Sequence, residues 1–389
     1  MIDVLVFFMV IAMGFGIQKS FSRNLNIIDK KNLKNLWLYH VLFGVIYWAY
    51  IVYGPGGDSI GYYRASNILA PQDALYLFSM NGPGTYGMYV LNVFPAKFMG
   101  FFGLTLIYTL LGYIGIVCFY VLFVNHIQFN STLGKYKLFP LVLFLPNLHF
   151  WSAGLGKDTL LFFCIGMFFY SMQQPSKHLI KIAVVMVLSY IIRPHITIFL
   201  IASFGLGYVL DGNLKMYQKV IIGGLFLVAF ILLFDRIMGF LKLEDLDAET
   251  VNQFSESKAS LLSRSHTGSS VDISSYPYPL KIFTFLYRPL FFDINGVLAI
   301  VASFENLLLL VLSWKLFKLN PIKIFKAGNF ILKSLFIFLI IGSLTFSLIL
   351  GNLGIMLRQK NMFIPALLFV CLWGFSYAAQ QKKRKLKVS

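Results

Sequence analysis

An arginine, a proline and a histidine interrupt an apolar stretch of the chain, where Arg193, Pro194 and His195 stand in the sequence SYIIRPHITIF. A charge inside an apolar segment is costly and by default faces a partner or a water-filled cavity. A proline also releases backbone hydrogen-bonding groups, which protein or water must then satisfy. We expect Arg193 to bind an anion at a break between two short helices, with His195 as a candidate acid–base group. The alternatives are an arginine that extends to the membrane surface and a histidine that only stabilises a helix end.

A glycine-rich turn carries the second candidate site, WSAGLGKDT at residues 151–159. It is not a Walker A motif, because one residue instead of four separates its glycines and Asp158 follows Lys157. Backbone N–H groups at the start of a helix, with Lys157 beside them, would instead bind a phosphate. In the alternative interpretation the turn is only capped, and Lys157 and Asp158 pair with neighbouring groups.

The third candidate is GPGGDSIGYYRASN at residues 54–67. Asp58 is placed to act as a general base on a sugar hydroxyl, and Tyr62 and Tyr63 could stack on the sugar ring. Arg64 adds a positive charge within two helical turns of Asp58. The alternative is an interfacial helix that Asp58 caps and whose tyrosines lie at the level of the lipid headgroups.

A second Arg-Pro pair, Arg288 and Pro289, follows the motif YPYPLKIFTFLY, with Asp293 five residues after the arginine. Glu305 lies within the next apolar segment, where an acid needs a partner or a cavity. We therefore expect both carboxylates to support a charged site.

The elements that must position these residues are transmembrane helices. The 389 residues are 58% hydrophobic and only 12% charged, whereas soluble proteins carry about a quarter charged residues. Apolar segments that cross or nearly cross a core of about 30 Å predict an all-α polytopic bundle of about 11 helices in a single integral membrane domain, residues 1–389. The expected spans are 2–18, 35–53, 104–125, 138–151, 159–172, 182–192, 196–210, 220–238, 294–314, 330–350 and 361–378.

Other classes of protein are excluded by the same composition. The net charge of +18 is scattered among short loops, which argues against a nucleic-acid partner. Cys118, Cys164 and Cys371 lie in apolar segments without metal-ligand spacing, so we predict neither a metal site nor a disulfide framework. Asp3 stands where a signal peptide would be basic, so we expect the first span to be retained.

Basic residues set the expected topology. Alternate loops hold 21 of the 33 Lys and Arg residues, which predicts an external N-terminus and a cytoplasmic C-terminus. The long segments 54–103, with an interfacial helix, and 239–293, a possible lid, are then external loops. Arg358 and Lys360 also fall on the external side, where a basic residue has no topological role and an anionic ligand would explain it.

The short external turn that contains Asp58 and is followed by tyrosines, together with four further motifs, resembles those of Wzy-type and EpsG-type polysaccharide polymerases. The four motifs are LPNLHFWSAGLGKD, IRPH, RPLFFD followed by SFENL, and GNLGIMLRQKNMFIPAL. The resemblance implies a membrane glycosyltransferase that needs neither metal nor cofactor. It would move a growing glycan from undecaprenyl pyrophosphate onto a new lipid-linked repeat unit, at the outer face of the bacterial cytoplasmic membrane. Its partners would be this lipid-linked oligosaccharide, membrane lipids and a chain-length regulator or a flippase.

The resemblance also implies roles for the residues named above. Basic side chains would bind the pyrophosphate, and Asp58 or His195 would act at the acceptor hydroxyl. The expected pyrophosphate ligands are Arg193, Arg288 and Arg358, with Lys157 and Arg64, and the supporting residues are Asp158, Glu305 and Asp293.

Two other functions stay open. A glycosyltransferase of the GT-C class, using a lipid-phosphate sugar, usually has a carboxylate pair in its first external loop, whereas Asp58 and Asp73 stand alone here. A flippase or exporter of lipid-linked oligosaccharide should carry charges along several spans, whereas Glu305 is nearly alone at mid-depth.

Overall fold

The computed structural model describes residues 2–54, 56–133, 135–211, 215–221, 223, 224, 228, 269–273 and 275–388. Within these ranges the fold is all-α, with one short hairpin in which β1 (Thr132–Leu133) pairs antiparallel with β2 (Tyr136–Lys137). Most of the expected span 220–238 and most of the expected lid 239–293 lie outside the described residues. The chain divides into two compact units, residues 1–126 with 140–197 and residues 127–139 with 198–389.

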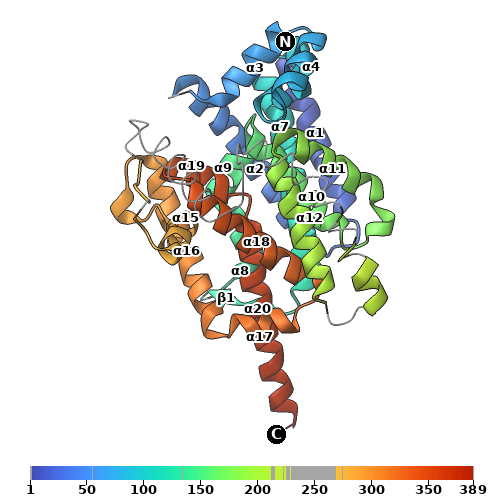
Figure 1. Ribbon diagram of the computed structural model, residues 1–389, viewed down its shortest axis with the longest axis vertical. Coiled ribbons are helices and arrows are strands. Elements are labelled where there is room, and N and C mark those ends of the chain that lie inside the picture. The colour runs from blue at the N-terminus through green and yellow to red at the C-terminus, as the bar shows by residue number, and fades with distance from the viewer. Residues whose placement is uncertain are drawn as a thin grey trace. The chain divides into compact units, whose positions relative to one another are not determined.

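The first unit is built around α7 (Phe101–His126), which is buried along most of its length. A glycine on α7 lets a neighbouring backbone come close, since a Cβ at Gly112 would lie 1.8 Å from the carbonyl oxygen of Ser152. The hydroxyl of Tyr113 donates to the carbonyl oxygen of Leu33 at 2.9 Å, which joins α7 to α2. The other helices of this unit (Figure 1) are α1 (Ile2–Phe21), α2 (Ile27–Tyr53), α3 (Asp58–Ile68), α4 (Pro71–Asn81), α5 (Thr85–Asn92), α6 (Pro95–Phe98), η1 (Val142–Phe144), α9 (Pro146–Ala153), α10 (Lys157–Ser171), η2 (Pro175–Lys177) and α11 (Leu179–Ile192).

The second unit is built around α18 (Phe330–Ile349) and α20 (Ile364–Val388). The Phe338 ring on α18 is 5.0 Å from the ring of Phe363, the residue just before α20, and a Cβ at Gly342 would lie 2.0 Å from the Phe363 ring. α20 is buried in its first half and ends in the exposed basic residues of the tail (Figure 1). The remaining elements are α15 (Tyr278–Tyr287), η3 (Phe291–Asp293), α16 (Val297–Lys318), α17 (Pro321–Ala327) and α19 (Leu353–Lys360), while α8 (Leu138–Leu141) and α12 (Pro194–Val209) have residues in both units.

Six helices of the described residues are long and apolar enough to cross a membrane, namely α1, α2, α7, α16, α18 and α20. The pair α9 and α10, bent by 109°, would bring the number to seven if it forms one span. Leu5 and Phe8 on α1 are 63% and 64% exposed, as expected for side chains in contact with lipid. The chain is therefore a membrane protein.

The segment 138–151, expected as one span, is broken into α8, η1 and α9. Phe139 has a non-helical backbone (φ −89°, ψ 129°), because the residue before a proline is disfavoured in the helical region. Pro146 then begins α9 at its first position, where a missing N–H costs no hydrogen bond. Two prolines thus divide a run that hydropathy alone presents as continuous.

Candidate functional site

The glycine-rich turn of the first unit leads from α9 into α10. Gly156 precedes α10, and no side chain caps the helix. The Tyr47 ring packs on Gly154 so closely that a Cβ there would lie 2.1 Å from it. Thr159 donates from Oγ1 to the carbonyl oxygen of Gly154 at 2.6 Å. These contacts hold the turn against α2 and fix the start of α10, where the helix dipole places a partial positive charge.

Lys157 is the first residue of α10, and two other helices orient its ammonium group. Nζ donates to Oγ1 of Thr85, the first residue of α5, at 3.0 Å. Nζ also lies 5.5 Å from the ring centroid of Tyr62, a buried residue of α3, within the range of a cation–π contact. Lys157 therefore has a defined position at the α10 terminus.

Arg193 ends α11 and brings a second positive charge to the same place. Its backbone N–H donates to the carbonyl oxygen of Ser189 at 2.7 Å, its backbone is extended, and Pro194 begins α12. Its Nη1 lies 3.3 Å from Oδ1 of Asp158, and the two side chains are only 14% and 11% exposed. The predicted break at Arg193 is present, and the structure brings Lys157, Asp158 and Arg193 together.

A turn that the sequence analysis did not select builds part of this cluster. Gly84 has φ 104°, a region that favours glycine, and its N–H donates to the carbonyl oxygen of Ile191 at 3.0 Å. A Cβ at Gly87 would lie 2.3 Å from that same oxygen. The run NGPGTYG, rich in glycine, was the available signal, and its consequence is to place Thr85 beside Lys157.

Asp58 and His195, the two candidates to act at the acceptor hydroxyl, differ in their exposure to solvent. Asp58 begins α3 and is exposed, next to Ser59, whose Oγ is 2.6 Å from the Tyr47 hydroxyl oxygen. Arg64 is exposed on the same helix. Burial, together with the nearby Arg193 charge, lowers the pKa of His195 to about 3, so this imidazole is neutral and a weak base at neutral pH.

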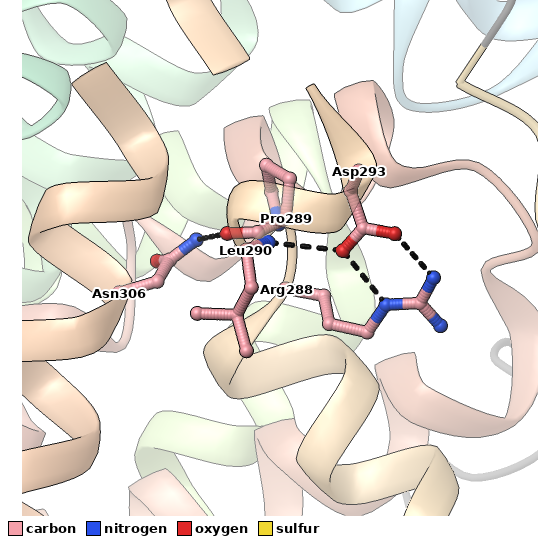
Figure 2. Close-up of polar contacts among 5 residues, drawn as sticks. All are labelled: Arg288, Pro289, Leu290, Asp293 and Asn306. Carbon is pink, nitrogen blue, oxygen red and sulfur yellow. Dashed lines mark hydrogen bonds and ion pairs between the residues drawn. The ribbon is translucent and has the colours of Figure 1, made fainter. Parts of the chain in front are cut away.

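In the second unit, Arg288 closes its own turn (Figure 2). Its guanidinium makes two hydrogen bonds to Asp293, with Nε 3.0 Å from Oδ2, and the two side chains are 14% and 7% exposed. Asp293 also accepts from the N–H of Leu290 at 2.9 Å, and Asn306 donates to the carbonyl oxygen of Pro289 at 2.7 Å. Arg288, expected to bind pyrophosphate, and Asp293, expected as a supporting residue, form a bidentate ion pair with each other.

Lys360, the last residue of α19, contacts the backbone of the same turn. It is 1% exposed and donates to the carbonyl oxygens of Leu286 and Arg288 at 3.3 and 2.9 Å, and to Oδ1 of Asn306 at 2.7 Å. Burial lowers the pKa of Lys360 to about 7, and the Glu305 carboxylate acts in the opposite direction. The sequence placed Lys360 beside Arg358 on one side of the membrane but gave no sign of these backbone contacts.

Glu305 and Arg358 complete the predicted residues of the second unit. Glu305 lies on α16, is 6% exposed and acts electrostatically on Lys360. Arg358 is half-buried on α19. Asn352 caps that helix, accepting from two first-turn N–H groups at 2.9 and 3.1 Å. Lys360 and Asp293 therefore contact the turn at residues 288–293, and Glu305 acts on it through Lys360.

The chemistry that these clusters can perform is the binding of anions and the positioning of hydroxyl groups. The first unit combines an ammonium, a guanidinium and a helix N-terminus, which suits a phosphate or pyrophosphate. The described residues contain no group of three His, Cys, Asp or Glu side chains that could hold a metal ion.

No protein-family model matches the chain, and no curated protein or solved structure is significantly similar to it.

Proposed function

We propose that this protein polymerises oligosaccharide repeat units, carried on undecaprenyl pyrophosphate, into a surface polysaccharide at the outer face of the bacterial cytoplasmic membrane. The proposal combines the motif resemblance with a membrane fold and a basic cluster of defined geometry. In this scheme the chain has about 11 spans, an external N-terminus and a cytoplasmic C-terminus. The glycine-rich turn and the Arg193 break then face the outside.

One observation supports this function most strongly. Arg193 reaches the start of α10, whose first residue is Lys157, through an ion pair of 3.3 Å with Asp158. Two cationic side chains and a helix N-terminus attract an anion at a site of low exposure, and Arg193 would bind it by sharing or exchanging its partner Asp158. A departing pyrophosphate is an anion whose negative charge grows in the transition state, so preorganised cations there would accelerate its release.

The reaction can be written with its groups assigned. The hydroxyl oxygen of the new repeat unit attacks the anomeric carbon of the growing glycan, and the bond between that carbon and the pyrophosphate oxygen breaks. Lys157 and Arg193 stabilise the leaving pyrophosphate, while Arg64 attracts the substrate. Asp58 takes the hydroxyl proton, because His195, with its pKa near 3, is a poor proton acceptor at neutral pH. His195 instead positions the hydroxyl as a neutral hydrogen-bonding group.

The second unit has a supporting role in this proposal. Arg358 contributes positive charge, and Asp293 and Lys360 hold the backbone around Arg288. Because the guanidinium of Arg288 already binds a carboxylate through two hydrogen bonds, binding pyrophosphate would require it to share or exchange that partner.

Deletion of the gene in its native host tests the proposal. A polymerase loss should leave surface glycan with one repeat unit in place of a ladder on a gel, and the wild-type chain should restore the ladder. An unchanged ladder would refute the function. Loss of all capped glycan would indicate a flippase, and a ladder with altered spacing would indicate a transferase that adds a single sugar.

A further inference from the structure

An open cavity of about 520 Å³ lies in the first unit, apart from the basic cluster. Its polar lining consists of Asp3, Tyr63, Asn67 and Lys97, and its apolar lining includes Phe98, which is 68% exposed. The cavity is located where α1 and α7 both begin. Both helices are candidate membrane spans, so the cavity lies at the level where a bilayer places its headgroups.

The walls are held by hydrogen bonds within the protein. The N–H of Gly100 donates to Oδ1 of Asp3 at 2.8 Å, and Asn67 donates from Nδ2 to the carbonyl oxygen of Ala96 at 2.7 Å. A Cβ at Gly100 would lie 2.4 Å from Oδ2 of Asp3. Glycine at this position therefore lets the carboxylate reach the start of α7.

These internal bonds leave a distinct set of groups for a ligand. Tyr63 donates its hydroxyl proton to the carbonyl oxygen of Met99 at 3.3 Å, so its oxygen can only accept. Oδ1 of Asn67 and Oδ2 of Asp3 are likewise acceptors that receive no hydrogen bond from the described residues. Lys97 donates one bond, to the carbonyl oxygen of Asn67 at 3.2 Å, and an ammonium group has three donors. The cavity thus offers several acceptors near one carboxylate and spare donors on one cation.

We propose that this cavity binds the headgroup of a phospholipid that carries a primary ammonium, as phosphatidylethanolamine does. The lipid ammonium donates to Asp3, with Asn67 and Tyr63 as further acceptors, and the lipid phosphate accepts from Lys97. An anionic glycerol headgroup would leave the Asp3 carboxylate facing negative charge. A choline headgroup has no N–H to donate. This inference does not depend on the proposed glycan chemistry.

Native mass spectrometry of the full-length protein in detergent tests the proposal, with phosphatidylethanolamine, phosphatidylcholine and phosphatidylglycerol of identical acyl chains. We expect phosphatidylethanolamine to bind about tenfold more tightly than the other two, the effect of one charge-assisted hydrogen bond. Asp3→Asn keeps an acceptor for the Gly100 N–H and should remove the preference over phosphatidylcholine. Lys97→Gln should weaken the binding of phosphatidylethanolamine and of phosphatidylcholine by about tenfold each.

The control is Lys177→Gln, which removes an exposed lysine elsewhere in the same unit and should change nothing. All variants are first matched by thermal unfolding, so that misfolding is not read as lost binding. The proposal is overturned if phosphatidylglycerol binds as tightly as phosphatidylethanolamine, or if Asp3→Asn retains the preference. It is also overturned if soluble glycerophosphoethanolamine binds as tightly as the lipid, because a free solute would then be the ligand.

Discussion

The two Arg-Pro pairs of this protein have the same backbone contacts but different side-chain partners. Arg193 and Arg288 each end a helix, and each backbone N–H donates to the carbonyl oxygen four residues earlier, at 2.7 and 3.2 Å. Each arginine side chain is 14% exposed and forms an ion pair with an aspartate. Arg193, however, reaches Asp158 on another helix, whereas Arg288 binds Asp293 within its own turn.

The position of the carboxylate decides what each arginine can do. The Arg288 pair is bidentate and local, a geometry that fixes a turn. The Arg193 pair lies at the start of α10, where Lys157 and the helix dipole add positive charge. Identical dipeptides thus build a rigid turn in one unit and a basic cluster in the other.

When the two arginines are substituted, the largest expected difference between them is in the proposed polymerase activity. Under the proposed function, Arg193→Ala should lower polymer formation by about 100-fold or more, because a desolvated charge contact of this kind contributes about 2–5 kcal/mol. Arg288→Ala should lower it less than tenfold per folded molecule. Both are measured in membranes supplied with lipid-linked repeat units, with Arg193→Lys as the variant that keeps the charge and loses the planar fork. Equal losses in Arg193→Ala and Arg288→Ala would contradict the comparison.

The second effect is on stability, and we expect it to be larger for the Arg288 pair of the second unit than for the Arg193 pair of the first. Arg288→Ala should lower the free energy of unfolding by about 2 kcal/mol, since it leaves Asp293 unpaired at low exposure. The double variant Arg288→Ala/Asp293→Ala should lose less than the sum of the single variants. Chemical unfolding in detergent measures all three, and strict additivity would show that the pair contributes nothing.

The third effect concerns the packing that brings Thr85 to Lys157. Gly87→Ala places a methyl group against the carbonyl oxygen of Ile191 and should destabilise the protein by about 2 kcal/mol. Gly61→Ala is the matched control, because a Cβ at that helical position has no atom within 4 Å and alanine favours helix. Similar unfolding midpoints for the two variants would argue against the close contact.

The smallest effect is a pH dependence due to Lys360. The folded protein releases this proton near pH 7, whereas an unfolded chain holds it to about pH 10.4. The unfolded state therefore binds more protons between these values, and stability should rise with pH by up to about 1 kcal/mol per pH unit.

Lys360→Met, which cannot titrate, isolates this slope from all other groups. Unfolding is followed from pH 7 to 9 in both proteins, and the difference between their slopes is the readout. Parallel curves would show that Lys360 keeps its proton throughout this range, through its three acceptors and Glu305.

Part of the candidate site could be predicted from sequence because it is local. Pro194 disfavours a helical backbone at Arg193, and Gly154 and Gly156 lie just before α10, so the break and the turn follow from neighbouring residues. The partners of these residues could not be predicted. Almost all of α10, together with η2 and α11, separates Asp158 from Arg193 along the chain, and nothing in either motif specifies the other.

Lys360 is a second case in which the sequence did not predict the partners of a charged residue. Its sequence context, beside Arg358 in a polar segment, indicates a basic group available to a ligand. The fold instead buries it and satisfies its three donors with two carbonyl oxygens and Asn306. A buried ammonium needs such acceptors, and only the packing of α15, α16 and α19 supplies them.

The sequence by itself determined that this is an all-α membrane protein, because apolar segments of spanning length leave no other way to satisfy their backbone groups. Proline and glycine also indicated the break at Arg193 and the turn before Lys157, whereas the breaks within segment 138–151 were not predicted. The tertiary structure alone decided which charges meet, since ion pairs form between residues that packing brings within a few ångströms. Two Arg-Pro pairs of equal local character acquired different partners for that reason.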